Sequence, residues 1–369
     1  MRLEPKPAPS LGVLLLYPLA AILATLVIAS LLVLAAGASP FSVFYLVVKG
    51  AAGSQFALME TLSRATPLIF TGLAVAVAFR AKLWNIGAEA QLYIGGDATG
   101  SSWARLPPAS TPPLIPITLV PGMAGLLPLP SFLLIPIIMV AAMAAGALLL
   151  LGPAMLKTRF GVDEVVTTLL LNFIVLLFVS MLLEGVLKDP MGLGWPQSQK
   201  VIAEAQLPRI VTGRRLHYGF VIALVAAVVV WVVMKKTALG YEMRAVGHNA
   251  EGACFLGIPV NTVLMKTALL SGGLAALAGF SEVSGLKGNL TLDLSPGFGY
   301  SGIVVAMLAM LNPLGVVLSA IFVAGVFVGA DAMSRSAGVP SYIADVMVAT
   351  SLLTMVTAML LVRYRVRWR

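Results

Sequence analysis

The sequence contains one cysteine and two histidines in 369 residues, and these shortages exclude several classes of site. Cys254 alone can form neither a disulfide within the chain nor a cysteine cluster for a metal. His217 and His248 do not stand in a His-Glu-x-x-His pattern, which excludes that zinc protease site. The chain also lacks a Gly-x-Ser-x-Gly motif and any Gly-Lys dipeptide. That serine nucleophile motif and the Walker A loop for ATP are therefore absent from the sequence.

Charge is also scarce. Charged residues make up 11% of the chain and hydrophobic residues 59%, with a mean hydropathy of +0.99. Soluble domains are about 25% charged, and a globular protein of this size cannot hide so much apolar surface from water. We therefore predict a polytopic membrane protein. The net charge of +9 is interpreted as basic cytoplasmic loops, because Lys and Arg gather on that side of membranes.

Long uncharged runs predict an all-α fold with about ten transmembrane helices, each of roughly 20 residues. The predicted spans are 11–36, 56–79, 83–104, 131–156, 164–187, 216–234, 267–283, two within 294–330, and 341–362. The third span is weak because it carries the polar residues Asn85, Glu89, Gln91 and Asp97. The proline-rich stretch 106–130 is interpreted as an outer loop or a re-entrant piece.

The distribution of Lys and Arg predicts the orientation. With both termini cytoplasmic, fourteen of these residues fall inside, nine outside, and Arg64 within a span. The opposite orientation places the four-arginine C-terminal tail outside, against the positive-inside rule. We predict one transmembrane domain over 1–369, with an outer loop at 188–215 and a cytoplasmic loop at 237–262.

The cytoplasmic loop carries signals for a short, separate helix. Asn249 suits the N-cap, Glu251 lies in the first turn, and Gly257 followed by Pro259 suits the C-terminal end. These signals predict a helix of about seven residues, roughly 10 Å long. With Phe255 exposed on it, the helix is either a docking element or part of an ordinary connecting loop.

Four segments resemble permease subunits of bacterial ATP-binding-cassette (ABC) importers of the sugar, nucleoside and branched-chain amino acid group. They are 239–249 with Ala253 and Gly257, 84–91, 163–172, and 296–306 with 312–315. The last three resemble the nucleoside and simple-sugar branch, which works with binding proteins of the basic membrane lipoprotein type. One departure is Ala90, where that branch usually has glycine before the glutamine.

The resemblance implies a multi-pass subunit of the bacterial cytoplasmic (inner) membrane that is not an enzyme and binds no cofactor. A separate ATPase subunit binds ATP and Mg²⁺, a second related permease completes a heterodimer, and an extracytoplasmic lipoprotein delivers the solute. The implied solute is a nucleoside or related small polar molecule, imported by alternating access, and no nucleic acid is involved. The residues implied in ATPase coupling are Gly240, Glu242, Arg244, Gly247, Asn249, Glu251, Phe255 and Gly257.

Polar residues within the predicted spans are candidates for the solute path, because ionisable groups in a bilayer commonly face the protein interior or water. Asn85 and Glu89 are predicted to lie one helical turn apart on one face, with Gln91 on another side. Glu89 either caps or pairs within the bundle or lines the path. A secondary carrier that uses Glu89 or Asp97 as its intramembrane carboxylate is the alternative function, and it needs no ATPase.

Asn172, Phe298 and Tyr300 complete the candidate path. Asn172 lies in mid-helix among apolar residues, so we expect an interhelical partner, either for packing or together with solute contact. Phe298 and Tyr300 either stack on a planar base or sugar face or belong to the aromatic belt at the interface.

Two further patterns predict how the helices pack. Small residues in 271–279 and the Gly325-x-x-x-Gly329 motif predict close helix contacts. Glu60 and Arg64 are predicted to pair along one helix, and Glu282 to lie near the interface at a helix end.

Overall fold

The computed structural model describes residues 2–5, 11–35, 37–103, 130–337 and 364–367, with a few single positions between 342 and 357. The stretch 106–129 and the predicted last helix, 341–362, lie outside the described residues. The described helices are, in chain order, α1 (Leu11–Ala35), α2 (Pro40–Ala52), α3 (Gln55–Arg80), α4 (Ala88–Trp103), α5 (Ser131–Phe160), α6 (Glu164–Glu184), η1 (Ala203–Ala205), α7 (Gly219–Lys236), α8 (Ala238–His248), α9 (Ala250–Phe255), α10 (Val260–Glu282), the π-helical η2 (Val283–Lys287), α11 (Phe298–Leu308) and α12 (Pro313–Ala337).

Capping residues set several of these helix ends. Ser54 accepts a hydrogen bond from Ala57 N at 3.1 Å before α3, and Asp163 accepts one from Val165 N at 2.8 Å before α6. Such caps satisfy backbone donors that have no partner within the helix. Gly161 ends α5 in the left-handed region, with φ at 67°, where a residue without Cβ is favoured.

Six helices in the described part of the chain are long and apolar enough to cross a membrane. They are α3, α5, α6, α7, α10 continued by η2, and α12, and the pair α1–α2, bent by 114°, makes a seventh if it is one span. The structure thus confirms a helical, multi-pass architecture. It adds one small sheet, in which β1 (Arg2–Pro5) pairs antiparallel with β2 (Tyr364–Arg367).

Two helices are additions to the sequence prediction. The helix α2 begins with Pro40 directly after Ser39, a position where the fixed φ of proline suits the first helical turn. The helix α8 begins after Thr237, whose Oγ1 accepts a hydrogen bond from Gly240 N at 3.3 Å. The segment 237–262, predicted to be a cytoplasmic loop, therefore contains two consecutive helices, α8 and α9, where the sequence predicts one short helix.

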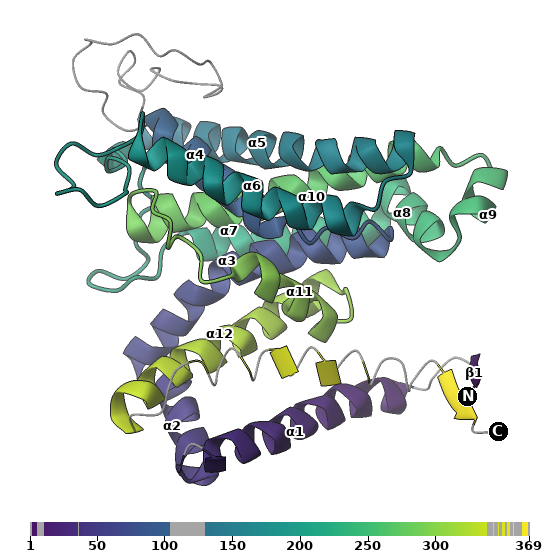
Figure 1. Ribbon diagram of the computed structural model, residues 1–369, viewed down its shortest axis with the longest axis horizontal. Helices are drawn as coiled ribbons and strands as arrows, with labels where there is room; N and C mark the ends of the chain where they lie inside the picture. Colours follow the sequence, from purple (N-terminus) through teal and green to yellow (C-terminus); the bar gives the residue numbers. More distant parts are fainter. Residues whose placement is uncertain are drawn as a thin grey trace.

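The helix α10 occupies the centre of the bundle, packed against α3, α4 and α5 (Figure 1). Its small residues allow this approach, because Gly272 lies directly against Gly146 of α5. Gly329 of the Gly-x-x-x-Gly motif packs likewise on the backbone of Val47 in α2. The prediction that small residues mediate close helix contact is confirmed, and this motif is used within the chain.

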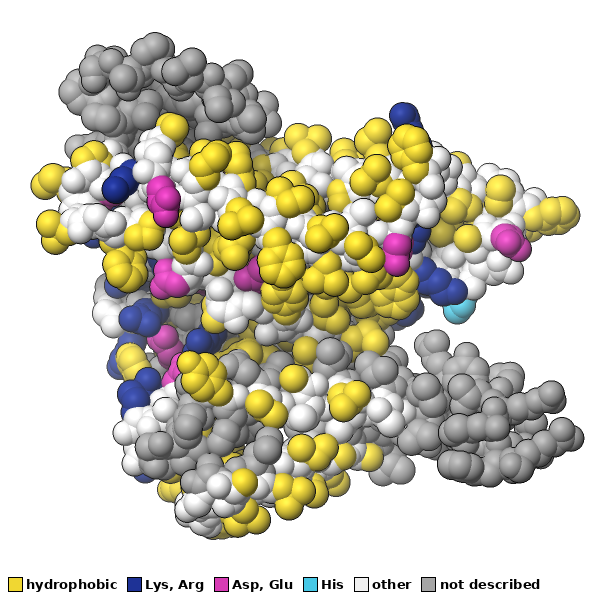
Figure 2. All heavy atoms as spheres, in the orientation of Figure 1, with side chains coloured by type: hydrophobic (Ala, Val, Ile, Leu, Met, Phe, Trp, Pro, Cys, Tyr) yellow, Lys and Arg dark blue, Asp and Glu magenta, His cyan; other side chains and the backbone are white. Residues whose placement is uncertain are grey.

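The outer faces of α5 and α6 are apolar, and Figure 2 shows hydrophobic side chains spread over them. Leu148, Leu170, Phe173 and Leu177 are among the exposed ones. Apolar side chains on such faces are suited to lipid or to another transmembrane subunit.

Two charged residues differ from their predicted pairing. Glu60 and Arg64 do not pair with each other: Arg64 Nη1 lies 2.5 Å from Asp331 Oδ2, and Arg215 Nη1 lies 3.1 Å from Glu60 Oε1. Partners from other elements have replaced the local i,i+4 contact. Glu282, predicted near the interface at a helix end, is the last residue of α10 and only 2% exposed, and η2 continues the helical segment beyond it.

Candidate solute path and docking helix

The side-chain amides of Asn85 and Gln91 form a buried pair near the start of α4. They exchange two hydrogen bonds of 2.9 Å, and Asn85 Nδ2 also donates to Ser271 Oγ at 3.0 Å. The prediction that Asn85 shares a helical face with Glu89 is wrong, because α4 begins only at Ala88. Asn85 lies in the preceding turn, which folds its side chain back onto Gln91.

Glu89 contacts the beginning of α11. Its Oε2 accepts a hydrogen bond from Gly299 N at 2.6 Å, and its side chain is largely buried. Ser295 Oγ accepts from the two preceding amides, Gly297 N at 3.2 Å and Phe298 N at 2.8 Å. The first amides of a helix lack internal partners and favour negative charge. Glu89 thus acts as a cap supplied by a second helix.

Asn172 joins three elements of the candidate path. Its Oδ1 accepts from Ala90 N at 2.9 Å, and its Nδ2 donates to Ile86 O and to Tyr300 Oη, both at 3.0 Å. The expected interhelical partner of Asn172 is therefore present. Phe298 is buried, whereas Tyr300 is 41% exposed, so of these two aromatic rings only that of Tyr300 reaches the surface.

The six candidate residues gather around the first turns of α4 and α11. Two serines that sequence reasoning left out belong to the same network: Ser271, which links α10 to Asn85, and Ser295, which caps α11. For Ser271 the sequence predicts only a role as a small packing residue. The described residues contain no group of three or more His, Cys, Asp or Glu side chains placed to hold a metal ion.

The helix α8 is anchored against the ends of α7 and α3. A Cβ added at Gly240 or Gly247 would overlap a carbonyl oxygen, that of Val233 in α7 or that of Arg80 in α3. Arg244 donates to the carbonyl of Met234. These three candidate coupling residues therefore hold α8 in place, and Glu242 is half-buried beside them.

The helix α9 projects from the same end of the molecule (Figure 1). Asn249 Oδ1 accepts from Glu251 N and Gly252 N at 3.1 Å each, which confirms the predicted cap. Gly257 has a φ of 80°, the left-handed conformation that the predicted helix end requires. The helix is six residues long. Phe255 is 91% exposed.

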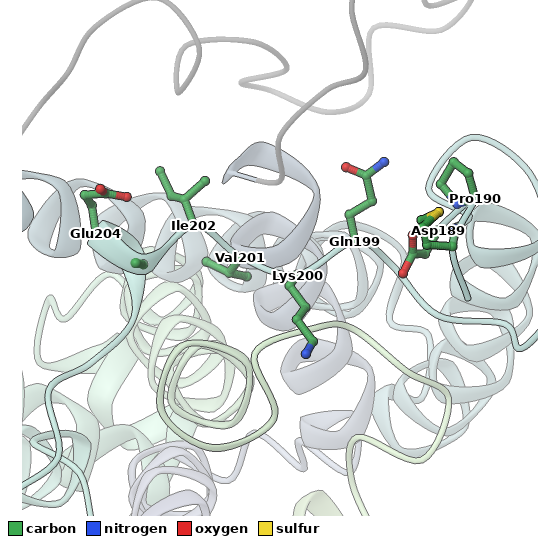
Figure 3. Close-up of a pocket in the computed structure, with 9 residues that line it drawn as sticks. Asp189, Pro190, Gln199, Lys200, Val201, Ile202 and Glu204 are labelled. Carbon is green, nitrogen blue, oxygen red and sulfur yellow. Dashed lines mark hydrogen bonds between the residues drawn. The ribbon is translucent and has the colours of Figure 1, made fainter. Parts of the chain in front are cut away.

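The segment 188–215, the predicted outer loop, is hydrogen-bonded to the segment that leads from η2 to α11. Ser198 N donates to Leu290 O at 2.9 Å, and Val201 N donates to Gly288 O at 2.8 Å. A groove of about 500 Å³ runs along this loop, with Asp189, Pro190, Gln199, Lys200, Val201, Ile202 and Glu204 among the residues that line it (Figure 3). The loop is thus an ordered surface.

His217 lies between this loop and α7 and is 1% exposed, and its Nδ1 accepts from Gly219 N at 3.1 Å. Burial, followed by the charge of Arg209, lowers the pKa of His217 from 6.5 to about 4. The ring is therefore neutral at neutral pH.

Comparison with known proteins identifies relatives over most of the chain. Residues 57–364 match the family described as branched-chain amino acid transport system / permease component. A glucose ABC transporter permease protein of Haloferax volcanii is 33% identical over 359 residues, covering 95% of this chain and 89% of that protein. A guanosine ABC transporter permease protein of Bacillus subtilis is 35% identical over 346 residues, covering 92% of each. A nucleoside ABC transporter permease protein of Lactococcus lactis is 29% identical over 342 residues, covering 90% of this chain and 88% of that protein. No solved structure matches the chain significantly.

Proposed function

Because the chain belongs to the family of branched-chain amino acid transport system permease components, we propose that it forms the solute path of an ABC importer. Relatives with this role cover almost its whole length, and two of them are 33% and 35% identical to it. As a permease, the chain performs no covalent chemistry. Its contribution to transport is a difference in affinity for solute and partners between two conformations.

The observation that carries the docking part of the proposal is α9, a capped helix that projects from the bundle with Phe255 almost fully exposed. An exposed aromatic residue on a short, rigidly held helix is suited to a pocket on a partner subunit. We assign that pocket to the ATPase, which binds ATP and Mg²⁺. Asn249 and Gly257 shape α9, Glu251 and Phe255 contact the partner, and α8 is its base.

The proposed topology has ten spans with both termini in the cytoplasm. Adding α4, α11 and the predicted helix at 341–362 to the seven candidate spans gives that number. Basic residues at the α9 end, including Arg80, Lys157 and Lys235, support a cytoplasmic position for it. In Figure 1, β1 and β2 lie at that same end. The corresponding location is the cytoplasmic membrane.

The proposed solute is a nucleoside or a sugar, as the names of the relatives suggest. Its path includes Asn85, Glu89, Gln91, Asn172, Phe298 and Tyr300, which surround the starts of α4 and α11. Among these, Tyr300 offers a partly exposed ring that can stack on a nucleobase or a sugar face. A second, related permease completes the path, and an extracytoplasmic binding lipoprotein delivers the solute at the outer loop.

Uptake into vesicles tests the proposal. The chain is reconstituted with the proposed partners, an ATPase, a second permease and a binding protein, and labelled guanosine and glucose are offered separately. We expect uptake of one solute that requires ATP and the binding protein. Uptake driven by a proton gradient without nucleotide would contradict the proposal and favour the secondary carrier.

A further inference from the structure

The turn between α3 and α4, residues 81–87 (the α3–α4 turn), lies between the docking end and the candidate path. At its start, Lys82 Nζ donates to His248 O of α8 at 3.5 Å, directly after the close contact between Arg80 and Gly247. At its end, Asn85 binds Gln91, and Ile86 O accepts from Asn172. The α3–α4 turn therefore contacts both α8 and the polar network at the start of α4.

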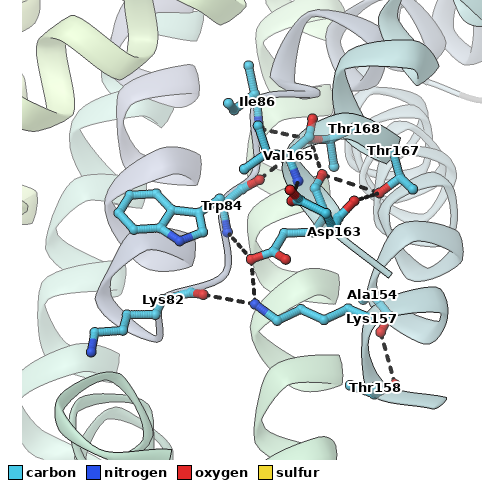
Figure 4. A network of polar contacts seen from close by, with 11 residues as sticks. Lys82, Trp84, Ile86, Ala154, Lys157, Thr158, Asp163, Val165, Thr167 and Thr168 are labelled. Atoms are coloured by element: carbon cyan, nitrogen blue, oxygen red, sulfur yellow. Dashed lines mark hydrogen bonds and ion pairs between the residues drawn. The ribbon is translucent and has the colours of Figure 1, made fainter. Parts of the chain in front are cut away.

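An ion pair holds this turn by its backbone. Lys157, near the end of α5, pairs with Glu164, at the start of α6. Lys157 Nζ also donates to Lys82 O at 3.1 Å, and Glu164 Oε1 also accepts from Trp84 N at 3.3 Å (Figure 4). The Glu164 side chain is only 8% exposed, so salt screens this pair less than a surface pair. The two charges thus bind one carbonyl and one amide of a non-helical segment.

A neighbouring residue extends the contact by one helical turn. Thr168 lies four residues after Glu164 in α6, and its Oγ1 accepts from Ile86 N at 3.3 Å. The rings of Phe79 and Trp84 meet edge to face with centroids 4.7 Å apart. The hydrogen bond between Ile86 and Thr168 therefore joins two of the segments that carry the family resemblance, 84–91 and 163–172.

We propose that Lys157 and Glu164 are positioning residues that transmit movement of α8 and α9 to α4 and α11. The proposal rests on the proposed function of the chain as an ABC importer permease. A non-helical turn absorbs a displacement by changing its backbone dihedrals unless other groups hold it. By binding the turn at Lys82 O and Trp84 N, the ion pair makes a displacement of α8 reach Asn85 and, beyond it, the contact of Glu89 with α11.

The test measures solute imported per ATP hydrolysed by the complete complex in proteoliposomes. Glu164→Ala removes the acceptor of Trp84 N together with its charge, and Lys157→Met removes the donor to Lys82 O. We expect each to lower this ratio at least fivefold while the ATPase still co-purifies with the permease. The control Glu60→Gln breaks the Arg215–Glu60 pair at the opposite end of α3 and leaves the ratio within twofold. A wild-type ratio in both Lys157→Met and Glu164→Ala would overturn the proposal.

A charge swap distinguishes the effect of the hydrogen bonds to the α3–α4 turn from the effect of having two opposite charges side by side. In the double variant Lys157→Glu with Glu164→Lys, opposite charges still face each other, but Lys82 O loses its donor and Trp84 N its acceptor. We expect the ratio to stay at least fivefold low, and a return to the wild-type ratio would overturn the proposal. If the swapped chain fails to insert, the ratios in Lys157→Met and Glu164→Ala decide the question. Failure of the proposed function has a different signature, namely a wild-type complex that imports no solute with ATP.

Discussion

The buried carboxyl group of Glu89 has a role as a helix cap, and this role does not require it to carry a transported proton. Its Oε2 accepts from Gly299 N at the start of α11, where helix amides favour a negative partner. A carboxylate that carries a coupled proton has to change charge, whereas a cap only has to accept a hydrogen bond. The two roles therefore respond differently to amide substitution.

We expect Glu89→Gln to retain much of the uptake, because the amide oxygen still accepts from Gly299 N. Glu89→Ala leaves that amide without its partner and is expected to cost about 2 kcal/mol of stability and most of the uptake. Thermal unfolding in detergent and vesicle uptake measure the two effects. Equal loss of uptake in both variants would show that the charge itself is required.

His217, between the segment 188–215 and α7, is expected to make the folded chain sensitive to acid. Its pKa falls from 6.5 to about 4 on folding, so between these values the unfolded chain takes up a proton that the folded chain does not. The contribution of neutral His217 to the free energy of unfolding is therefore complete above pH 6.5. It declines as the pH falls towards 4, by about 3 kcal/mol over the whole interval.

His217→Gln is expected to flatten this decline when thermal unfolding is compared between pH 7 and pH 5. The matched control is His248→Gln, since His248 is exposed at the end of α8, and it should leave the slope unchanged. An unaltered slope in His217→Gln would show that other groups govern the acid response.

At the scale of elements, local signals in the sequence predicted helix ends well. Asn249 and Gly257 bound α9 as expected, because a cap and a left-handed glycine act within a few residues of each other. The position of Asn85 could not be predicted in this way. Whether α4 begins before or after it depends on Ser271 and Gln91, whose places are set by the tertiary packing.

The partners of charged residues were likewise set by tertiary packing and not by local sequence. The local pair Glu60–Arg64 was available in sequence, yet each residue found a partner more than 100 positions away. The small residues of α10 did predict close packing, because side-chain size limits helix approach whatever the partner is. Which helices they would meet, α4 and α5, is a property of the whole fold.

The helix α9 carries the prediction at this scale. Phe255→Asp keeps the caps of α9 and its fold but places a charge where an apolar contact is proposed, and it is expected to weaken co-purification of the ATPase at least tenfold. Leu193→Asp, at an equally exposed position on the outer loop, is the matched control and should leave co-purification unchanged. Normal recovery of the ATPase with Phe255→Asp would contradict the docking role of α9.

Gly257→Arg tests the shape of α9 rather than its surface. With φ at 80°, any side chain there adds strain of about 1–2 kcal/mol, which the chain relieves by altering the end of α9. We expect membrane insertion to be retained and ATP-dependent uptake to fall several-fold. Insertion is measured by membrane fractionation and uptake in vesicles, and full uptake would show that the end of α9 tolerates the change.

At the scale of the whole molecule, the fold connects two polar ends through one bundle. The outer loop is hydrogen-bonded to the segment before α11, and α8 lies against the α3–α4 turn, so both ends lead towards the contact of Glu89 with α11. Composition alone predicted a membrane protein, and motif resemblance predicted its class. The meeting of both ends at α11 is visible only in three dimensions.

We propose that α9 faces the cytoplasm and binds the ATPase, and a side chain of α9 itself can report on both. Cys254 is the single cysteine of the sequence and lies exposed on α9. A membrane-impermeant maleimide is applied to intact cells and to inverted vesicles, the latter with and without bound ATPase. We predict no labelling in intact cells, labelling in inverted vesicles stripped of the ATPase, and protection when it is restored. Labelling from outside, or full labelling with the ATPase bound, would contradict the account.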